Sequence, residues 1–511
     1  MDAVAVRALR SDLEAARFTV EHLTSLWGAE AEAALERGDR VAARRTLADS
    51  DAPAAVLARL FVLGLDLPRA DLDHALPSLG AAGAVALGLV HGGDPVAPAR
   101  DLRPYSFIDT QGAGQWWIVS DPGELVTGGA LRTDHVLGVG GATATLSGLS
   151  LPGPVGSALD LGTGCGIQAM HLARVATRVV ATDISHRALE TAELNVALND
   201  ISGVELRHGS LFAPVAGERF DRVLSNPPFV VTPRRPGVPA YEYRDGGAVG
   251  DAIVEQLVTG MAGHLEPGGI AQLLGNWEYR DGRDGLERVL AWCDTGGLDA
   301  WIIERERQDP AQYAETWIRD GGTRPGAPGY EELVDAWLDD FAARGVEGVG
   351  FGYLLLRRPS GERTLRRAER IGTPLGAEPG GLGAHLAAAL AAHDAVTALD
   401  DAALLRLPMT VAPDVTEERS HWPGEEHPSV IVLRQGGGFR REVRAGTALA
   451  AVVGACDGEL STQAIVDAVA GLLEADPVAL AAELAPQLRE LLVGGLLSLP
   501  AGIQDPSRRP T

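Results

Sequence analysis

The 511-residue sequence contains no lysine and only three cysteines. All 44 basic residues are therefore arginine, and with 69 Asp and Glu the formal net charge is −25 at pH 7. This charge argues against a protein that coats nucleic acid non-specifically, because phosphate contacts supply most of the affinity of such proteins, although a local basic groove remains possible. Cys165, Cys293 and Cys456 lie far apart without C-x-x-C spacing, so neither a disulfide framework nor a zinc site is expected.

Long apolar runs are missing as well. Runs such as residues 81–90 (AAGAVALGLV) are too short to span a bilayer, and the N-terminal residues lack the order of a signal peptide. We therefore expect no membrane association and a cytoplasmic location. A hydrophobic content of 46% is sufficient for buried cores in two to four domains.

A glycine-rich turn follows a short apolar stretch that ends at Asp160. Gly162, Gly164 and Gly166 alternate there, and a helical pattern begins at Ile167. Glycines suit such a turn because the backbone must adopt open φ values and approach a ligand closely, with the helix N-terminus facing it. The pattern therefore predicts a strand, a ligand-binding turn and a helix.

This turn has two interpretations. Gly164, Gly166 and Ala169 also fit the dinucleotide fingerprint G-x-G-x-x-A, with Asp183 at the end of the next strand, so the glycines alone do not separate the alternatives. Asp160 does help, because a carboxylate at that position suits a ligand carrying an ammonium better than one carrying a pyrophosphate.

A second motif, Asn226-Pro227-Pro228-Phe229, closes the strand DRVLS at the edge where open α/β sheets bind their ligands. Two successive prolines lock the backbone, so the Asn226 side-chain oxygen and the Pro227 carbonyl form a rigid acceptor pair for both hydrogens of a planar NH2 group. Phe229 is predicted to stack on the plane that carries this group.

With the glycine turn and Asp183 in register, the chain resembles the class I S-adenosylmethionine-dependent methyltransferases over residues 101–360. Within them it resembles the N-methyltransferases with an (N/D)PP(Y/F) motif, which act on glutamine amides, adenine N6 or guanine N2. The resemblance implies a Rossmann-like α/β domain with a mainly parallel seven-stranded sheet. It implies S-adenosyl-L-methionine as cofactor and no metal.

The resemblance also assigns roles to the site residues. Asn226, Pro227, Pro228 and Phe229 would hold the methyl acceptor, and Asp183 would accept from the ribose hydroxyls. Ser210 stands where family members commonly have Asp or Asn, which puts the contact with the adenine amine in doubt. The cofactor-binding residues implied are Asp160 near the ammonium, Gly162, Thr163, Gly164 and Gly166 along the methionine moiety, Ile184 and Phe212 as adenine walls, and Asp183, Ser210, Leu211 and Asn226.

Three domains are expected. Residues 1–100 are predicted to be helical and winged-helix-like, residues 101–360 to form the methyltransferase domain, and residues 361–511 to form an α+β, winged-helix-like module. The acidic balance of the first segment favours protein docking or structural support over nucleic-acid binding. A metal site at His421 and His427 is conceivable, but a solvated turn is favoured.

Around the motifs, several elements are expected. Strands YSFIDT and QWWIVSD are expected to pair in antiparallel fashion. The glycine-containing segment 135–149 precedes the cofactor strand, and in related enzymes the corresponding segment lies across the methionine end of the cofactor. A Pro/Gly-rich loop after Thr232 is a candidate substrate lid, with Tyr241, Tyr243 and Arg244 as possible substrate contacts, although a mobile surface is equally compatible.

The expected activity is methyl transfer to a planar amide or exocyclic amine nitrogen of a macromolecule, with a protein glutamine slightly favoured. The alternatives are an RNA or DNA base methyltransferase acting on guanine N2 or adenine N6, a degenerate methyltransferase fold that serves as a binding scaffold, and a nicotinamide-dependent oxidoreductase. The expected partner is therefore a protein or nucleic-acid substrate.

Overall fold

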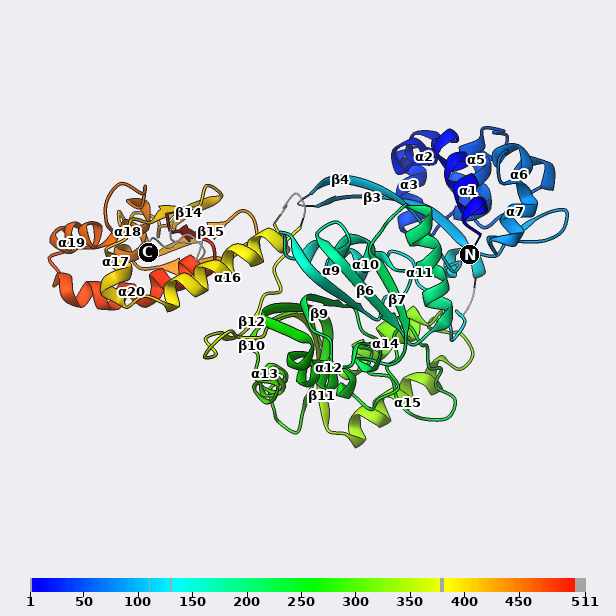
Figure 1. The fold of residues 1–511 in the computed structure, drawn as a ribbon. Helices are drawn as coiled ribbons and strands as arrows, with labels where there is room; N and C mark the ends of the chain where they lie inside the picture. The colour runs from blue at the N-terminus through cyan, green and yellow to red at the C-terminus, as the bar shows by residue number, and fades with distance from the viewer. Residues whose placement is uncertain (1, 110, 129–130, 377–380, 501–511) are drawn as a thin grey trace. The chain divides into compact units, whose positions relative to one another are not determined.

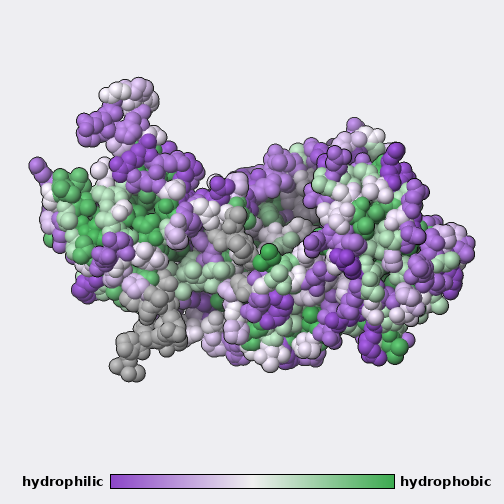
Figure 2. Space-filling view, turned by 90° about the horizontal axis from the view of Figure 1, so that it is seen from above, coloured by the Kyte–Doolittle hydropathy of each residue, from purple (hydrophilic) through white to green (hydrophobic). Residues whose placement is uncertain are grey.

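The computed structural model describes residues 2–109, 111–128, 131–376 and 381–500. Its contacts divide the chain into two compact units, one of residues 1–147 and 153–370 and the other of residues 148–152 and 371–511. Figure 1 shows their helices and strands. Hydrophilic residues cover most of the face seen in Figure 2, with apolar residues scattered between them. No helix among the described residues has the length and apolarity needed to cross a membrane.

The first unit is built on an eight-stranded sheet with the order β12-β10-β11-β9-β8-β5-β6-β7. Neighbouring strands from β7 to β9 are parallel, whereas β11 is antiparallel to both β9 and β10. This is the predicted methyltransferase-type sheet with its antiparallel closing strand. The strands are β5 (Val155–Leu161), β6 (Ala176–Asp183), β7 (Val204–His208), β8 (Phe220–Ser225), β9 (Leu265–Arg280), β10 (Asp299–Gln308), β11 (Val346–Arg357) and β12 (Arg366–Arg370).

The prediction of seven strands is wrong by one, because β12 pairs in parallel with β10 at the edge of the sheet. Its sequence RRAER has no apolar alternation, so nothing in the pattern identified it as a strand. Trp301 on β10 donates to Glu369 on β12, at 2.6 Å between Nε1 and Oε1, and Arg370 is bonded to Glu304. The sheet therefore continues past residue 360.

Capping residues mark the ends of several helices around the sheet. Asp284 and Asp309 cap α13 and α14 through their side chains, and α13 ends at Gly297, which has a φ of 67°. The helices are α8 (Glu124–Thr127), α9 (Gly141–Leu149), α10 (Ile167–Leu172), α11 (His186–Leu198), α12 (Ala252–Met261), α13 (Gly285–Gly296), α14 (Pro310–Asp320) and α15 (Tyr330–Ala343), with 3-10 turns at Ala213–Val215 and Ala262–His264.

The N-terminal hundred residues are helical, as predicted, and end in a small hairpin of β1 (Val90–His91) and β2 (Ala97–Pro98). A bridge between Leu67 and Val96 joins this hairpin to the segment before α6. The winged-helix description of this region stays a prediction. The helices are α1 (Ala3–Ala15), α2 (Val20–Trp27), α3 (Ala29–Glu36), α4 (Val41–Leu47), α5 (Pro53–Leu57), the π-helix Ala58–Val62, α6 (Arg69–Ala75) and α7 (Gly80–Ala86).

These N-terminal helices share one hydrophobic core with elements that follow them in the same unit. The core includes Leu194 and Leu198 of α11 together with Leu102 and Val119 of the β3–β4 hairpin. That hairpin, β3 (Asp101–Asp109) with β4 (Gly112–Ser120), is the predicted antiparallel pair. A bond of 2.7 Å from the Trp117 indole nitrogen to the Phe18 carbonyl adds a polar link. The first hundred residues are thus packed onto the fold that follows them.

The second unit has its own core, formed by α16, α18, α19 and α20 with strands at its margin. His421 and His427 are both exposed, and no group of three or more potential metal ligands occurs among the described residues. Its elements are α16 (Gly383–Thr397), α17 (Asp401–Leu405), β13 (Thr410–Val411), β14 (Val415–Ser420), β15 (Val430–Gln435), β16 (Glu442–Ala445), α18 (Thr447–Gly454), α19 (Thr462–Leu472), α20 (Pro477–Val493) and β17 (Leu497–Ser498).

The shared core predicts that the first unit unfolds as one body. Leu198 is fully buried, so Leu198→Ala should lower the free energy of unfolding by about 3 kcal/mol through lost burial and a residual cavity. Urea denaturation followed by tryptophan fluorescence is suitable because every tryptophan except Trp422 lies in the first unit. The control Val4→Ala, at a side chain 67% exposed on α1, should change stability by less than about 0.5 kcal/mol. Separate transitions, of which only one responds to Leu198→Ala, would contradict a shared core.

Candidate functional site

A cavity of about 370 Å³ lies at the carboxyl ends of β5, β6 and β8. This edge of a parallel sheet is where open α/β folds bind ligands. The predicted residues that the structure brings to the cavity are Gly162, Thr163, Gly164, Asp183, Ile184, Ser210, Leu211, Asn226, Pro227 and Pro228. Asp160, Gly166, Phe212 and Phe229 are not among the lining residues of the described chain.

The glycine turn has the backbone that its sequence requires. Gly162, Gly164 and Gly166 have φ values of 79°, 55° and 90°. At Gly162 and Gly164 a Cβ would meet no atom within 4 Å and would project into open space, whereas at Gly166 it would lie 3.0 Å from the Ala192 Cβ. The first two glycines therefore leave room for a ligand, and the third permits close packing against α11.

Asp160 supports this turn from beneath. It is 1% exposed, and its Oδ2 accepts from the Thr163 hydroxyl at 2.5 Å and from the Ala169 amide at 2.9 Å. Its Oδ1 is buried without a hydrogen-bond partner in the described structure. Burial raises the pKa of Asp160 to about 7, despite the opposing effect of these two hydrogen bonds. An unsatisfied carboxylate oxygen next to the turn fits a cationic group.

Asp183 lies at the end of β6 with both oxygens in use. Oδ2 accepts from the Gly164 amide at 2.9 Å and Oδ1 accepts from the Ser185 amide at 2.8 Å. Burial raises its pKa above the usual value. Because each carboxylate oxygen can accept more than one hydrogen bond, Asp183 retains capacity for hydroxyl donors of a ligand in the cavity.

Asn226 presents an unsatisfied acceptor at the same edge. Its Oδ1 is buried and has no hydrogen-bond partner within the described residues, although it borders the cavity together with Pro227 and Pro228. A buried amide oxygen without a partner is costly in free energy unless a ligand supplies a donor. This atom therefore marks a place for an N–H group.

The two aromatic predictions differ from the structure. Phe229 is 8% exposed, and its ring packs against Trp317 of α14 and Phe351 of β11, with centroids 6.3 and 5.7 Å away. Phe212 stacks on the His264 ring at 4.3 Å instead of forming an adenine wall. Both rings are thus held by partners distant in sequence, which the local motif does not reveal.

The loop after the NPPF motif contributes one predicted residue to the cavity and two that were not predicted. Glu242, Tyr243 and Asp245 line it, whereas Tyr241 and Arg244 are buried. Arg244 donates to the Trp317 carbonyl at 2.9 Å and to Asp320 at 2.6 Å, so it anchors the loop to α14. Of the three candidate substrate contacts, the structure places Tyr243 alone at the cavity.

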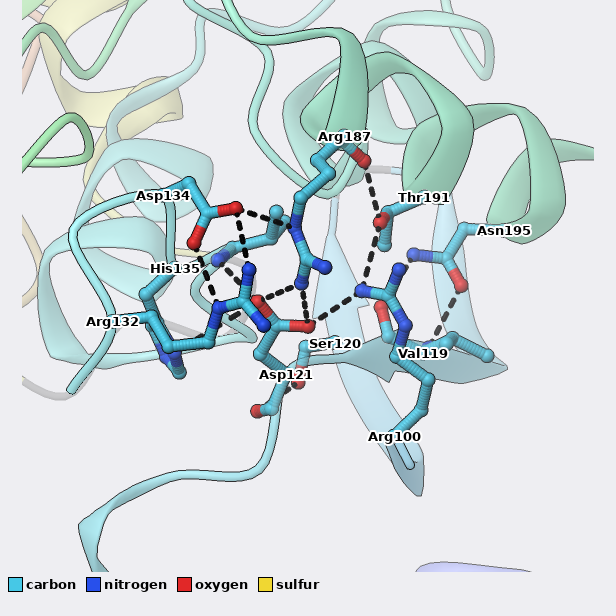
Figure 3. Close-up of polar contacts among 11 residues, drawn as sticks. Arg100, Val119, Ser120, Asp121, Arg132, Asp134, His135, Arg187, Thr191 and Asn195 are labelled. Carbon is cyan, nitrogen blue, oxygen red and sulfur yellow. Dashed lines mark hydrogen bonds and ion pairs between the residues drawn. The ribbon is translucent and has the colours of Figure 1, made fainter. Parts of the chain in front are cut away.

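The segment 131–138 forms another wall, and an ionic network that no motif predicted holds it in place (Figure 3). Asp121 is 6% exposed and accepts from the Val136 amide at 2.9 Å and from Arg100 at 2.5 Å. Arg187 of α11 also binds Asp121, and its Nε lies 3.5 Å from Asp134. One buried carboxylate thus connects the β4 strand end, α11 and the segment that covers the cavity.

The pKa of Asp160 predicts a pH-dependent stability. Between its ordinary value of 3.8 and about 7, the folded protein keeps a proton on Asp160 that the unfolded protein releases. The stability from this proton is present at low pH and is lost as the pH rises through that window. Within that window, the free energy of unfolding of the unmodified protein should therefore fall by about 1.4 kcal/mol per pH unit relative to that of the Asp160→Asn variant. Urea denaturation of both proteins at pH 5, 6, 7 and 8 measures this difference, and parallel profiles would refute it.

The sequence of this chain is similar to those of known proteins. Residues 141–295 match the family model described as Methyltransferase small domain, and residues 15–100 match a Domain of unknown function, DUF7059. A Release factor glutamine methyltransferase from Moorella thermoacetica is 41% identical over 166 residues, which cover 29% of this chain and 59% of that protein. A Ribosomal protein uL3 glutamine methyltransferase from Bradyrhizobium diazoefficiens is 32% identical over 33% of this chain and 54% of its own length.

The matches with several of these relatives span about half of their length. The Release factor glutamine methyltransferase from Cereibacter sphaeroides, in contrast, is 32% identical over 278 residues, which are 50% of this chain and 98% of that protein. The chain therefore belongs to the family of the release factor glutamine methyltransferases.

Proposed function

We propose that this protein transfers a methyl group from S-adenosyl-L-methionine to the side-chain amide nitrogen of a glutamine in a protein substrate. The observation that carries the proposal is the buried, unsatisfied Oδ1 of Asn226, fixed by two prolines at the edge of a cavity floored by glycines. The relatives named above are named for glutamine methylation of a release factor and of a ribosomal protein. That naming favours a protein amide over a nucleic-acid base and favours a cytoplasmic location.

The residues present fit the cofactor. Gly162 and Gly164 leave open space where side chains would stand, Asp183 offers carboxylate oxygens for ribose hydroxyls, and Asp160 offers a buried oxygen without a partner near the turn. When bound, S-adenosylmethionine supplies an electrophilic methyl group on a sulfonium sulfur. Ile184, which lines the cavity and is 60% exposed, provides an apolar surface for a flat ring.

The chemical role of the chain is to orient a weak nucleophile. An amide nitrogen reacts poorly because its lone pair is delocalised into the amide plane. When the Asn226 Oδ1 and the Pro227 carbonyl accept its two N–H groups, they fix its position and favour pyramidalisation towards the methyl group. With the cofactor bound, the nitrogen–carbon bond would form as the carbon–sulfur bond breaks, and the nitrogen would then release a proton to water. Catalysis thus relies on positioning and electrostatics.

Recruitment of the protein substrate is proposed for the flanking regions. Residues 1–100 and 361–511 flank the proposed methyltransferase domain of residues 101–360 and carry none of its motifs. The first flank packs against α11 through a shared core, so its role is examined best by surface substitutions. The second is a compact unit with its own core, so its removal is a feasible test of recruitment.

Asn226→Ala should separate chemistry from cofactor binding. It removes one acceptor for the target nitrogen but leaves the glycine turn and Asp183 intact. Turnover with a release-factor domain and labelled S-adenosylmethionine should therefore fall by about 10² to 10³, while cofactor affinity from calorimetry stays within a few-fold. Asn226→Asp keeps an acceptor and should retain more activity than the alanine variant. Unchanged turnover in Asn226→Ala would show that NPPF is only a structural turn here.

Asp183→Ala should instead act on the cofactor. Loss of a carboxylate that accepts a charge-assisted hydrogen bond should weaken S-adenosylmethionine binding by about 1.5–3 kcal/mol, measured by titration calorimetry. Asp109 makes a suitable control because its partner Arg174 lies outside the residues that line the cavity, so Asp109→Ala should leave the affinity unchanged. Binding of NADH with no response to S-adenosylmethionine would contradict the proposed function.

A further inference from the structure

A second cavity, of about 630 Å³, adjoins the first within the same unit. His135 lines both cavities, and at the start of α11 Ser185 and Ala188 line the first whereas Arg187 lines the second. The wall between them therefore consists of the segment 131–138 and the first turn of α11. On its other side, the β1–β2 hairpin contributes Val90, His91 and Pro98.

Positive charge prevails in this second cavity. Three guanidinium groups, those of Arg100, Arg132 and Arg187, line it, together with the single carboxylate of Asp121. Asp134 pairs with Arg132 and Arg187 at the same wall, so these three arginines and two carboxylates carry a formal charge of +1. Glu190 also acts on Arg100, but from outside the residues that line the cavity. Burial lowers the pKa of His135, which keeps this residue neutral.

The arginines have spare hydrogen-bond donors (Figure 3). Arg132 donates to Asp134 through Nε and Nη2, and Arg100 donates to Asp121 through Nη1. Arg187 donates to Asp121 through Nη2, and its Nε lies 3.5 Å from Asp134 without a hydrogen bond. Within the described part of the chain, each therefore keeps at least one guanidinium nitrogen that donates no hydrogen bond. A guanidinium with free N–H groups beside a cavity is suited to a planar oxyanion, which it can meet with two parallel bonds.

We propose that this cavity binds the carboxylate of an acidic residue in the protein substrate, close in sequence to the target glutamine. The inference rests on the proposed function, because it places a second part of the same substrate. A single carboxylate balances the charge of +1, whereas a phosphate dianion would meet Asp121 and Asp134 with excess negative charge. Since His135 lines both cavities and an extended chain advances about 3.5 Å per residue, we place the acidic residue within about five positions of the glutamine.

The test uses the full-length protein with S-adenosylhomocysteine and fluorescent peptides that contain one glutamine. Each peptide of the series carries a single glutamate, placed one to five residues before or after the glutamine. A matched peptide carries alanine at the same position. At the preferred position the glutamate peptide should bind about tenfold more tightly than its alanine partner. Failure to find such a position would overturn the proposal.

Arg132→Gln identifies the site without disturbing the fold, because the Arg132 side chain is 69% exposed and its partner is Asp134. It should reduce the preference for glutamate by about fivefold, and Arg132→Glu should favour an arginine peptide instead. The matched control is Arg419→Gln in the second unit, where an arginine 54% exposed pairs with Glu417 two residues away. This control should keep the full preference, and an unchanged preference in Arg132→Gln would refute the assignment.

Two further outcomes distinguish the alternatives. Displacement of the glutamate peptide by millimolar inorganic phosphate, or tighter binding of a phosphoserine peptide, would assign the cavity to phosphate and overturn the proposal. Methylation of each peptide is measured in parallel. Methylation without a glutamate preference refutes this inference alone, whereas a glutamate preference without methylation of any peptide refutes the proposed function.

Discussion

Two carboxylates at the ends of neighbouring strands hold the turn on which the site depends. Asp160 accepts from the Ala169 amide and Asp183 accepts from the Gly164 amide, so backbone N–H groups on both sides of the turn are fixed. A turn with three glycines in the left-handed region has few side chains to pack, and these hydrogen bonds replace that packing. Of the two, Asp183 also lines the cavity proposed for the cofactor, so the residue that fixes the turn is available to the ligand as well.

Helix α11 connects this site with the N-terminal helices. At its beginning, Ser185 and Ala188 border the first cavity and Arg187 borders the second. Near its end, Leu198 is buried in the core that the N-terminal helices supply. The region matched by a domain of unknown function is therefore part of the framework that positions the wall between the two cavities.

The sequence predicted the residues at strand ends because the topology of a parallel sheet brings those ends together. Asp183, Gly164 and Asn226 follow strands that the pattern identified, and the structure gathers them around one cavity. The directions of Phe212 and Phe229 were not predictable, since His264 and Trp317 hold their rings from elements far along the chain. Asp121 belongs to no motif, and its role arises only from the three segments that meet there.

The sharing of Asp121 between Arg187 and the Val136 amide has a thermodynamic consequence. Val136 lines the cofactor cavity, so a ligand group that draws Arg187 towards itself also changes how firmly that wall is held. The two binding equilibria are then linked, and the coupling must be reciprocal: an acidic substrate alters cofactor affinity by the same factor by which the cofactor alters substrate affinity.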